Sequence, residues 1–345
     1  MPYHRPTLAR KNDHIRINLE KDVSFRQVTT QLEAYRFIHQ ALPEINLEDV
    51  DTSTTFLGHT FAFPLLIAPM TGGTQMGERL NRVLAEVAQE IGIGMGLGSM
   101  RAALEAPETR ATFQMRRYAP DIFLVANLGA IQLNYGYGPA DCQKLVELVE
   151  ADALHLHLNP LQEALQPEGD TNFAGLVERI AEVCAALSVP VIVKEVGAGL
   201  STRAAHRLLE AGVAALDVAG AGGTSWSQVE MHRQRKPDQR QVAQTFREWG
   251  IPTAQSLQMA RDAAPSLPLI ASGGLRDGVE IAKALALGAD LTSMAGALLR
   301  TAATTPESLY SHIDIIRRQL QVTMFAVGAQ TIAALKETPL LHAPT

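Results

Sequence analysis

From Leu65 onward, short apolar runs alternate with segments in which apolar residues recur at helical spacing. Each run has the length and the flanking glycine or proline of a buried parallel strand. The predicted strands are Leu65–Met70, Ile93–Leu97, Ile122–Ala126, Ala153–Leu158, Val191–Glu195, Ala215–Val218, Leu267–Ala271 and Leu291–Ala295. The predicted helices between them are Glu78–Glu90, Pro107–Tyr118, Ala140–Glu150, Thr171–Leu187, Thr202–Glu210, Thr253–Ala264 and Asp277–Leu287. Eight strands joined by right-handed helical crossovers favour a closed (β/α)8 barrel, the TIM barrel, over an open sheet.

The segments outside this alternation flank the barrel. Residues 1–60 form an N-terminal extension, within which Phe25–Ala41 is predicted to be helical, and residues 61–345 form the barrel. The polar insert at residues 222–251 is far longer than an ordinary βα loop. Because it follows the sixth strand, we predict that it emerges at the catalytic face as a lid, with its arginine and lysine side chains facing solvent. Two further helices are expected in residues 306–345.

Composition limits the class of protein. Of 345 residues, 46% are hydrophobic and 19% are charged, which is enough apolar material for one large core. A net charge of −6 gives no general attraction to nucleic acid or to an anionic membrane, so a bound anion must be held by local groups. No apolar run reaches the ~18 residues that span a bilayer, and the first residues lack the apolar core of a secretion signal. We therefore expect a cytoplasmic protein. Cys142 and Cys184 lie on predicted helices and are expected to be reduced packing residues.

Glycines follow the last two predicted strands at the point where a barrel usually binds phosphate. Gly273 and Gly274 follow the seventh strand, and Gly296 follows the eighth. Such turns leave backbone N–H groups free, and Arg276 adds a positive charge at the same rim. The alternative is that these glycines only form tight turns. Thr224, after the glycines of the sixth strand, makes a third turn of this kind.

The carboxyl ends of the fourth and fifth strands carry the most polar side chains. The alternation of a strand places His155, His157 and Asn159 on one face, pointing into the barrel, and the leucines on the other. A zinc site is the alternative for the two histidines, but no third ligand has matching spacing. Glu163 is a candidate for Mg²⁺, which shares its coordination among few carboxylates, water and substrate oxygens. Lys194 needs a negative partner, and it either forms a Schiff base or stabilises an electron-rich cofactor.

The other strand ends offer hydrogen-bonding groups. Thr71 and Ser99 supply hydroxyls, and Arg101 supplies a planar group suited to phosphate oxygens. Asn127 places an amide at the rim, although an asparagine at such a turn is often only a helix cap. Together with His157 and with Arg10 and Lys11 of the extension, Arg101 is predicted to form a second anion site.

Motifs along nearly the whole chain resemble the type 2, FMN-dependent isopentenyl-diphosphate isomerase family. They are RKNDH at Arg10–His14, APMTGG at Ala68–Gly73, GLGSMR at Gly96–Arg101, ANLGA at Ala126–Ala130, HLHLNPLQE at His155–Glu163, VKEVG at Val193–Gly197, GAGGTSW at Gly220–Trp226, WGIPTA at Trp249–Ala254 and SGGLRDG at Ser272–Gly278. The resemblance implies a barrel that binds FMN and Mg²⁺, keeps the flavin reduced with NADPH, and interconverts isopentenyl and dimethylallyl diphosphate for isoprenoid biosynthesis. It further implies a homotetramer or homo-octamer, and an extension that packs on the barrel and contacts substrate.

The resemblance also assigns residues. FMN is expected to contact Met70, Thr71, Gly72, Ser99, Asn127, Lys194, Thr224, Gly274, Leu275, Arg276, Ala295 and Gly296. Substrate is expected to contact Arg10, Lys11, Ser99, Met100, Arg101, His157, Asn159 and Gln162, with Glu163 on Mg²⁺ and with Gln162, His157 and Lys194 as the catalytic residues. No carboxylate pair is aimed at the middle of the barrel. We therefore hypothesise that reduced FMN itself exchanges the protons and that Lys194 favours its anionic form.

Two other functions compete with this interpretation. An FMN-dependent oxidoreductase related to the 2-hydroxy-acid or inosinate dehydrogenases would oxidise its substrate, and the second of these needs a loop cysteine for which Cys142 and Cys184 are poorly placed. A barrel that only binds a phosphorylated ligand would turn over no diphosphate. The polar residues concentrated on the fourth and fifth strands argue against the second alternative.

Overall fold

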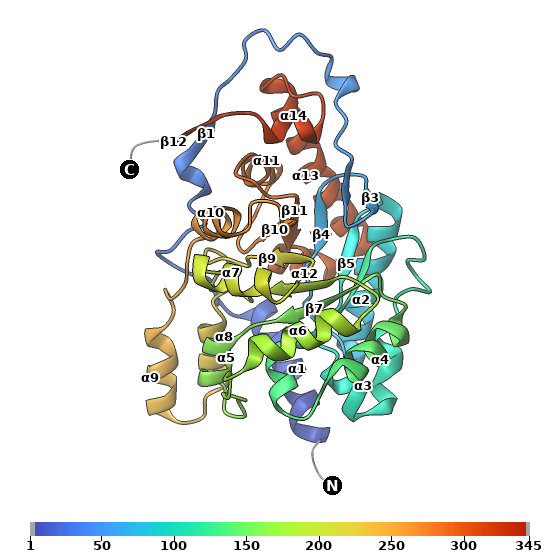
Figure 1. The fold of residues 1–345 in the computed structure, drawn as a ribbon, viewed down its shortest axis with the longest axis vertical. Coiled ribbons are helices and arrows are strands. Elements are labelled where there is room, and N and C mark those ends of the chain that lie inside the picture. The colour runs from blue at the N-terminus through green and yellow to red at the C-terminus, as the bar shows by residue number, and fades with distance from the viewer. Residues whose placement is uncertain (1–3, 343–345) are drawn as a thin grey trace.

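The computed structural model describes residues 4–342, which contain a closed barrel of eight parallel strands (Figure 1). Around the barrel the strands follow the order β10, β11, β4, β5, β6, β7, β8 and β9. Their bounds are β4 Leu65–Ile67, β5 Gly94–Gly96, β6 Leu124–Gly129, β7 Ala153–His157, β8 Val191–Lys194, β9 Ala215–Asp217, β10 Leu269–Ser272 and β11 Leu291–Met294. Every predicted strand is found, and the predicted TIM barrel is confirmed.

Helices surround the barrel mostly where the apolar spacing predicts them. The confirmed helices are α2 Gln75–Ile91, α4 Pro139–Val149, α6 Leu176–Ala186, α7 Thr202–Glu210, α10 Thr253–Ala263 and α11 Gly278–Ala286, with α12 Gly296–Ala302 after the last barrel strand. Both tail helices are present as α13 Pro306–Ala326 and α14 Ile332–Lys336. The predicted helix at Thr171–Leu187 begins later than expected, because Gly175 stands before α6 in a left-handed conformation, with φ of 67°.

The prediction of one α-helix at Pro107–Tyr118 is wrong. A short helix, α3, covers Arg101–Glu105, and a 3-10 helix, η3, covers Pro107–Phe113. Within η3 the hydroxyls of Thr109 and Thr112 donate to carbonyls three residues earlier, at 2.8 and 2.6 Å. Threonine side chains that bond the local backbone in this way compete with the α-helical pattern.

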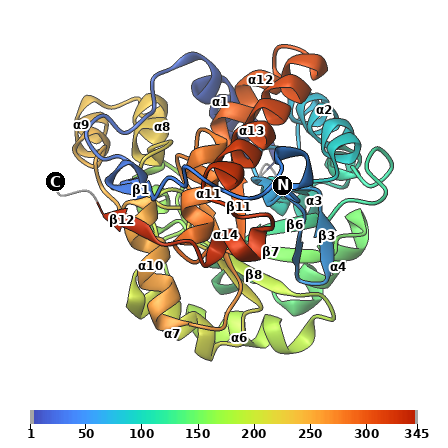
Figure 2. The same ribbon diagram turned by 90° about the horizontal axis from the view of Figure 1, so that it is seen from above.

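The predicted helix at Phe25–Ala41 is also wrong. This stretch contains only a 3-10 helix, η1, at Leu32–Ala34 and a short strand, β1, at Tyr35–Phe37. Its backbone groups bond distant segments instead, since the Glu248 carboxylate accepts from three successive N–H groups, those of residues 26–28. β1 pairs with β12 (Leu340–His342), and Figure 2 shows the two side by side. Tertiary contacts thus override local propensity here.

The barrel strands divide their side chains between two cores. On β7, Leu154 and Leu156 pack outward among the helices, and His155 is fully buried. This matches the predicted alternation of leucine and histidine. The second core is an apolar cluster of barrel residues. A hairpin of β2 (Thr54–Phe56) and β3 (His59–Phe61) packs Phe56 and Phe61 against it. The side chains that can reach a ligand are therefore expected at the carboxyl ends of the strands.

Three helices outside the barrel pattern gather near those ends. α1 (His4–Glu20) packs against α8 (Trp226–Arg233), and α8 packs against α5 (Pro160–Leu165). A second insert helix, α9 (Pro237–Thr245), lies on the outer side of α8 (Figure 1). None of the helices within residues 4–342 has both the length and the apolar character that crossing a membrane requires.

Candidate active site

One central cavity opens at the carboxyl ends of the barrel strands. Many predicted site residues line it, namely Arg10, Lys11, Met70, Thr71, Ser99, Arg101, Asn127, His157, Asn159, Gln162, Glu163 and Lys194. Residues that the sequence analysis did not assign complete the lining: His14, Pro69, Gly98, Gly129, Ile131, Gln132, Gln166, Val196 and Trp226. His14 and Trp226 lie within motifs that carried the family resemblance. Gln132 and Gln166 have no local signal that marks them.

The predicted phosphate residues gather separately, where the loops after β9, β10 and β11 meet; we call these loops the glycine turns. A Cβ added at Gly223 would lie 2.7 Å from the Gly274 nitrogen, and one added at Gly274 would lie 2.6 Å from the Gly222 oxygen. Gly296 lies near Thr224, whose hydroxyl is 3.7 Å from the position of an added Cβ. Within residues 4–342, the N–H groups of Gly274 and Leu275 donate to no other group. The turns therefore contain two unpaired backbone donors in a closely packed region, where the Thr30 side chain would lie 2.7 Å from a Cβ at Gly274.

His157 is held in one tautomer. Its Nδ1 lies 2.9 Å from Asn127 Oδ1, and the Asn127 amide is itself oriented because its Nδ2 donates to the Leu97 carbonyl. Nδ1 therefore carries the proton, and Nε2 is left as the free acceptor. Burial, together with the charges of Lys194, Lys11 and Arg10, lowers the pKa of His157 to about 3. The ring is neutral in the free protein.

Lys194 has the negative partner that a buried lysine requires. Its Nζ lies 3.9 Å from Asp217 Oδ2 and donates to the Glu195 carbonyl. Asp217 is fully buried, and its other oxygen accepts from the hydroxyl of Ser272. Burial raises the pKa of Asp217, against the opposing effect of the Lys194 charge. The fifth strand thus brings one cation, flanked by a carboxylate, to the floor of the cavity.

Cations of the predicted second anion site come from two elements. Lys11 on α1 donates to the Ser99 carbonyl at 2.7 Å and lies over the Phe113 ring, 5.3 Å from its centroid. Burial and the charge of Arg10 lower the pKa of Lys11 to about 7. Arg101 is paired through Nε with Glu105 at 2.6 Å and through Nη1 with Asp170 at 2.9 Å. Its Nη2 donates to none of the described residues and remains for a ligand.

Glu163 is enclosed by hydrogen-bond donors. Its Oε1 accepts from Asn159 at 2.9 Å, and its Oε2 accepts from the Gln166 amide and from the Asp170 N–H. Burial raises the pKa of Glu163, and the hydrogen bonds from Asp170 and Asn159 oppose that rise. Nearby, Asn159 Oδ1 is buried without a partner. Across the described residues, no group of three or more histidine, cysteine or acidic side chains forms a metal cage.

The insert contributes a buried carboxylate that the sequence analysis missed. Glu230 on α8 accepts from Gln162 and bonds His14, both at 2.9 Å, and pairs with Arg233 at 2.7 Å. Burial alone would raise the pKa of Glu230, but the bond to His14 and the charge of Arg233 lower it to about 2. The insert therefore reaches the catalytic face as predicted, and its action as a lid stays a prediction. The expectation that its cations face solvent is wrong for Arg233, whose side chain is only 6% exposed because it neutralises Glu230.

The remaining predicted contacts lie outside the central cavity. Arg276 turns outward to Glu280, with Nε at 3.0 Å, and its side chain is 71% exposed. Met100 is fully buried, and Gly72 packs its Cα against the ring of Phe113. Ala295 precedes α12 beside the glycine turns. Ligand contacts at these positions stay predictions.

Neither cysteine is placed for chemistry. Cys142 is fully buried and Cys184 is half-buried. Burial raises the pKa of Cys142 to about 12 and that of Cys184 to about 11, so neither thiol ionises readily near neutral pH. The expectation of reduced packing residues is met by their positions on α4 and α6.

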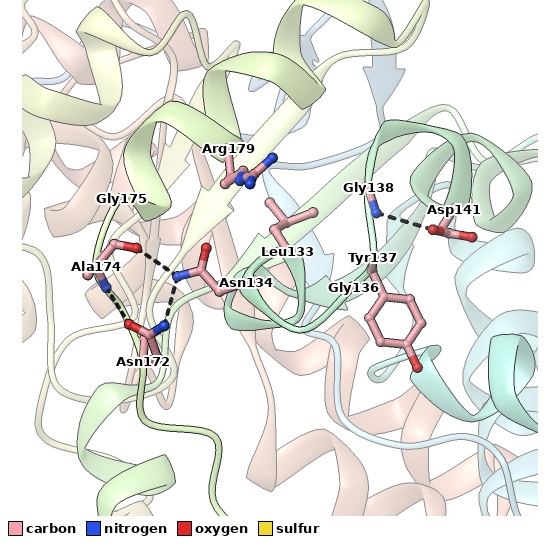
Figure 3. A pocket seen from close by; sticks show the side chains of 10 residues that line it. All are labelled: Leu133, Asn134, Gly136, Tyr137, Gly138, Asp141, Asn172, Ala174, Gly175 and Arg179. Atoms are coloured by element: carbon pink, nitrogen blue, oxygen red, sulfur yellow. Dashed lines mark hydrogen bonds between the residues drawn. The ribbon is translucent and has the colours of Figure 1, made fainter.

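A second, more open pocket lies between α4 and the start of α6 (Figure 3). Asn134 spans part of it by donating to the carbonyls of Asn172 and Ala174, at 2.7 and 2.9 Å. Arg179 at its edge pairs with Glu182. None of the predicted site residues lines this pocket, and its polar groups bond one another, so the central cavity remains the candidate active site.

Proteins of known name match almost the whole chain. A Synechococcus isopentenyl-diphosphate delta-isomerase is 53% identical over 96% of this chain and 96% of its own length. A Nostoc protein of the same name is 49% identical over 97% of this chain, and one from Rickettsia peacockii is 50% identical over 96%. The chain belongs to the isopentenyl-diphosphate delta-isomerase family. Residues 7–120 and 155–342 match the broader family described as FMN-dependent dehydrogenase, to which the chain therefore also belongs.

Solved structures support the fold. A mandelate oxidase with benzoyl-formic acid matches with a TM-score of 0.67 at 18% identity, over 99% of this chain and 97% of that one. A Pediococcus acidilactici lactate oxidase matches with a TM-score of 0.67 at 16% identity, over 96% and 87%. At this identity the likeness extends to the barrel architecture and no further.

Proposed function

We propose that this protein interconverts isopentenyl diphosphate and dimethylallyl diphosphate, with FMN and Mg²⁺ bound at the barrel mouth. The observation that carries the proposal is the pairing of two anion-binding regions. The glycine turns suit the phosphate of a cofactor, and the cluster of Arg101, Lys11 and His157 suits a diphosphate. The identity of the closely related proteins supports the same reaction.

Residues of this chain fit FMN. The unpaired N–H groups of Gly274 and Leu275 lie where a barrel holds phosphate, beside the start of α12. Thr71 Oγ1 is buried without a partner on the wall of the central cavity. Lys194 brings a positive charge to the cavity floor. When bound in its reduced form, FMN would supply the acid–base chemistry of the proton exchange.

The oxygen donors around Glu163 fit Mg²⁺. Each carboxylate oxygen has two lone pairs, and Oε1 of Glu163 uses one of them for Asn159. The unpartnered Oδ1 of Asn159 is a second oxygen donor. A site with so few protein oxygens suits Mg²⁺, which completes its shell with water and substrate phosphate. We propose that Glu163 holds the metal against the diphosphate.

The chain's own residues would orient the substrate and stabilise charge. Moving a double bond by one carbon requires that one proton is added at an alkene end and another is removed from the allylic carbon, with no net redox change. The diphosphate would be held by Arg101 Nη2, Lys11 and His157. Gln162 donates to Glu230 and accepts from Asn159, which fixes its amide and leaves one N–H and one lone pair for the cavity. Burial of these groups excludes water around the cation-like carbon skeleton.

The FMN-dependent oxidoreductases remain the second candidate by fold. They share this barrel at 16 to 18% identity. The relatives at about half identity are isomerases by name, which favours the redox-neutral reaction. Use of NADPH as reductant, a homotetrameric or homo-octameric state and a cytoplasmic location stay predictions.

A two-step experiment tests the proposed function. Purified protein should show a flavin absorption band, or gain one after incubation with FMN. Proton NMR of isopentenyl diphosphate with the dithionite-reduced protein and Mg²⁺, under anaerobic conditions, should then show dimethylallyl diphosphate. R317A, at an exposed position that does not line the cavity, serves as the control. A protein that takes up no FMN, or that leaves the double bond in place when reduced, contradicts the proposal, and net oxidation of a 2-hydroxy acid favours the alternative.

A further inference from the structure

Asp170 lies in the loop between α5 and α6, behind the wall of the central cavity. Its carboxylate oxygen Oδ2 accepts from Arg101 Nη1 at 2.9 Å and from Gln132 Nε2 at 3.1 Å. Its backbone N–H donates to Glu163 Oε2 at 2.8 Å. The side chain and the main chain of one residue thus hold two different parts of the site, the arginine of the diphosphate cluster and the carboxylate of the metal site.

The loop before Asp170 is shaped for this contact. A Cβ added at Gly169 would collide with the carbonyl of Glu163, so glycine is the residue that lets the loop lie against the end of α5. Gly169 also donates to the Gln166 carbonyl at 3.3 Å. This close approach brings the N–H of Asp170 to the Glu163 carboxylate.

Gln132 extends the same arrangement into the cavity. Its amide nitrogen is occupied by Asp170, while its Oε1 is buried without a partner, and the residue lines the central cavity. The Gln132 side chain lies beside Gly129, as does the His157 ring. Asp170 therefore orients two cavity-lining side chains by accepting from both.

We propose that Asp170 is a positioning residue that couples the diphosphate-binding arginine to the metal-binding carboxylate. This inference rests on the proposed function. In the proposed function, Asp170 contacts neither the substrate nor the metal. The carboxylate directs Arg101 so that Nη2 faces the anion, and the backbone N–H directs Glu163 so that Oε1 faces Mg²⁺.

Removing the charge of Asp170 changes the affinity for an anion in opposite directions for a positioning role and for a purely electrostatic role. Arg101 is paired with two carboxylates, Glu105 and Asp170. If Asp170 acted only through its charge, its removal would leave Arg101 more positive and tighten the binding of an anion. If Asp170 positions Arg101 and Gln132, its removal releases both side chains and weakens binding. Hydrogen bonds to charged groups contribute enough that the second effect is expected to dominate.

The test uses the reduced, FMN-loaded protein with D170A and D170N. D170A should raise the KM for isopentenyl diphosphate about tenfold while kcat changes less, and D170N, which keeps an acceptor oxygen, should restore part of the loss. In calorimetric titration with inorganic pyrophosphate and Mg²⁺, the unchanged protein should bind most tightly, D170N less tightly and D170A least tightly. D152N is the matched control, because Asp152 pairs with Arg116 at 2.8 Å with similar exposure but at the amino end of β7. Its KM should equal that of the unchanged protein.

Each outcome decides the inference. Tighter pyrophosphate binding by either Asp170 variant, or an unchanged KM and pyrophosphate affinity, overturns it; if D170A does not fold, D170N alone is decisive. G169A should raise the Mg²⁺ concentration needed for half activity, and an unchanged Mg²⁺ dependence overturns the backbone part. If the unchanged protein has no isomerase activity, the proposed function fails, while the pyrophosphate titration still tests Asp170.

Discussion

Asn127 Oδ1 accepts a hydrogen bond from His157 Nδ1 at 2.9 Å and thereby decides which ring nitrogen carries the proton. Asn127 cannot rotate freely, because its amide nitrogen donates to the carbonyl of Leu97, the residue directly after β5. The cavity side of His157 is consequently an acceptor in the free protein. An arriving diphosphate presents only acceptors, so His157 must gain a proton to bind it.

Substitution of Asn127 by alanine is expected to release this tautomer. Nitrogen NMR of labelled protein should show a protonated Nδ1 on His157 in the unchanged chain and a mixture of tautomers in N127A. Affinity for isopentenyl diphosphate should fall about tenfold, which is the typical effect of losing one charge-assisted hydrogen bond. N134A removes an asparagine of the second pocket and should alter neither measurement. An unchanged tautomer in N127A would show that other contacts orient the ring.

Binding of pyrophosphate should depend on pH through Lys11. The pKa of Lys11 is lowered to about 7 in the free protein by burial and Arg10, and a bound anion must raise it. Below pH 7 Lys11 is already charged, so it adds no pH dependence. Above pH 7 binding takes up a proton, and affinity falls by up to about tenfold per pH unit until the pKa of the complex is reached.

Calorimetry in buffers of different ionisation enthalpy measures this uptake. At pH 8 the unchanged protein should take up more protons than K11R, because an arginine at this position stays charged throughout. Equal uptake by the two proteins would assign the titration to another group, such as His157.

Replacing Lys194 by alanine should affect the flavin more than the diphosphate. Lys194 is the cation on the cavity floor, and its loss leaves Asp217 buried without its partner. K194A should lose FMN on dialysis or show a lower flavin reduction potential, with pyrophosphate affinity within about threefold of the original, since Arg101 and Lys11 are retained. Full FMN content together with unchanged turnover would contradict the role assigned to Lys194.

Glu230 should contribute to stability with a distinct pH dependence. E230Q keeps the shape but removes the buried carboxylate that pairs with Arg233, which then retains only Glu168, at 3.0 Å. This loss is expected to cost about 3 kcal/mol at pH 7. The pKa of Glu230 is lowered to about 2 from 4.5, so its stabilisation is present above pH 4.5 and is lost as the pH falls towards 2. In denaturant unfolding, the difference in the free energy of unfolding between E230Q and the unchanged protein should therefore decrease below pH 4.5. If that difference is constant with pH, the ion pair of Glu230 is not its source.

The barrel was predictable because its signals are local. Each strand is a short apolar run beside glycine or proline, and the alternation of Leu154, His155 and Leu156 indicates the inner face within three positions. The structure of Phe25–Ala41 could not be predicted in this way, because its backbone groups bond Glu248 and β12, which lie more than two hundred residues away in the chain. A helical spacing of apolar residues says nothing about such partners.

The site was predictable from spacing where strands end, and for Arg10 and Lys11 on α1 from the family resemblance. Arg101, Asn127, His157 and Lys194 follow from strand positions and lie around one cavity as expected. Glu230 and Asp170 lie in loops or inserts, and their partners Gln162 and Arg101 are 68 and 69 residues distant. Their roles depend on how separate segments meet, which no spacing along the chain reveals.

The position of α1 bears on how the protein is prepared. α1 carries Arg10 and Lys11 to the cavity mouth, and in Figure 1 α1 and β12 lie far apart, towards opposite ends of the molecule. A purification tag fused ahead of α1 places foreign charge close to the entrance for an anionic substrate. One fused behind β12 leaves that entrance clear, so kinetic constants from the two recombinant formats should differ most at low ionic strength.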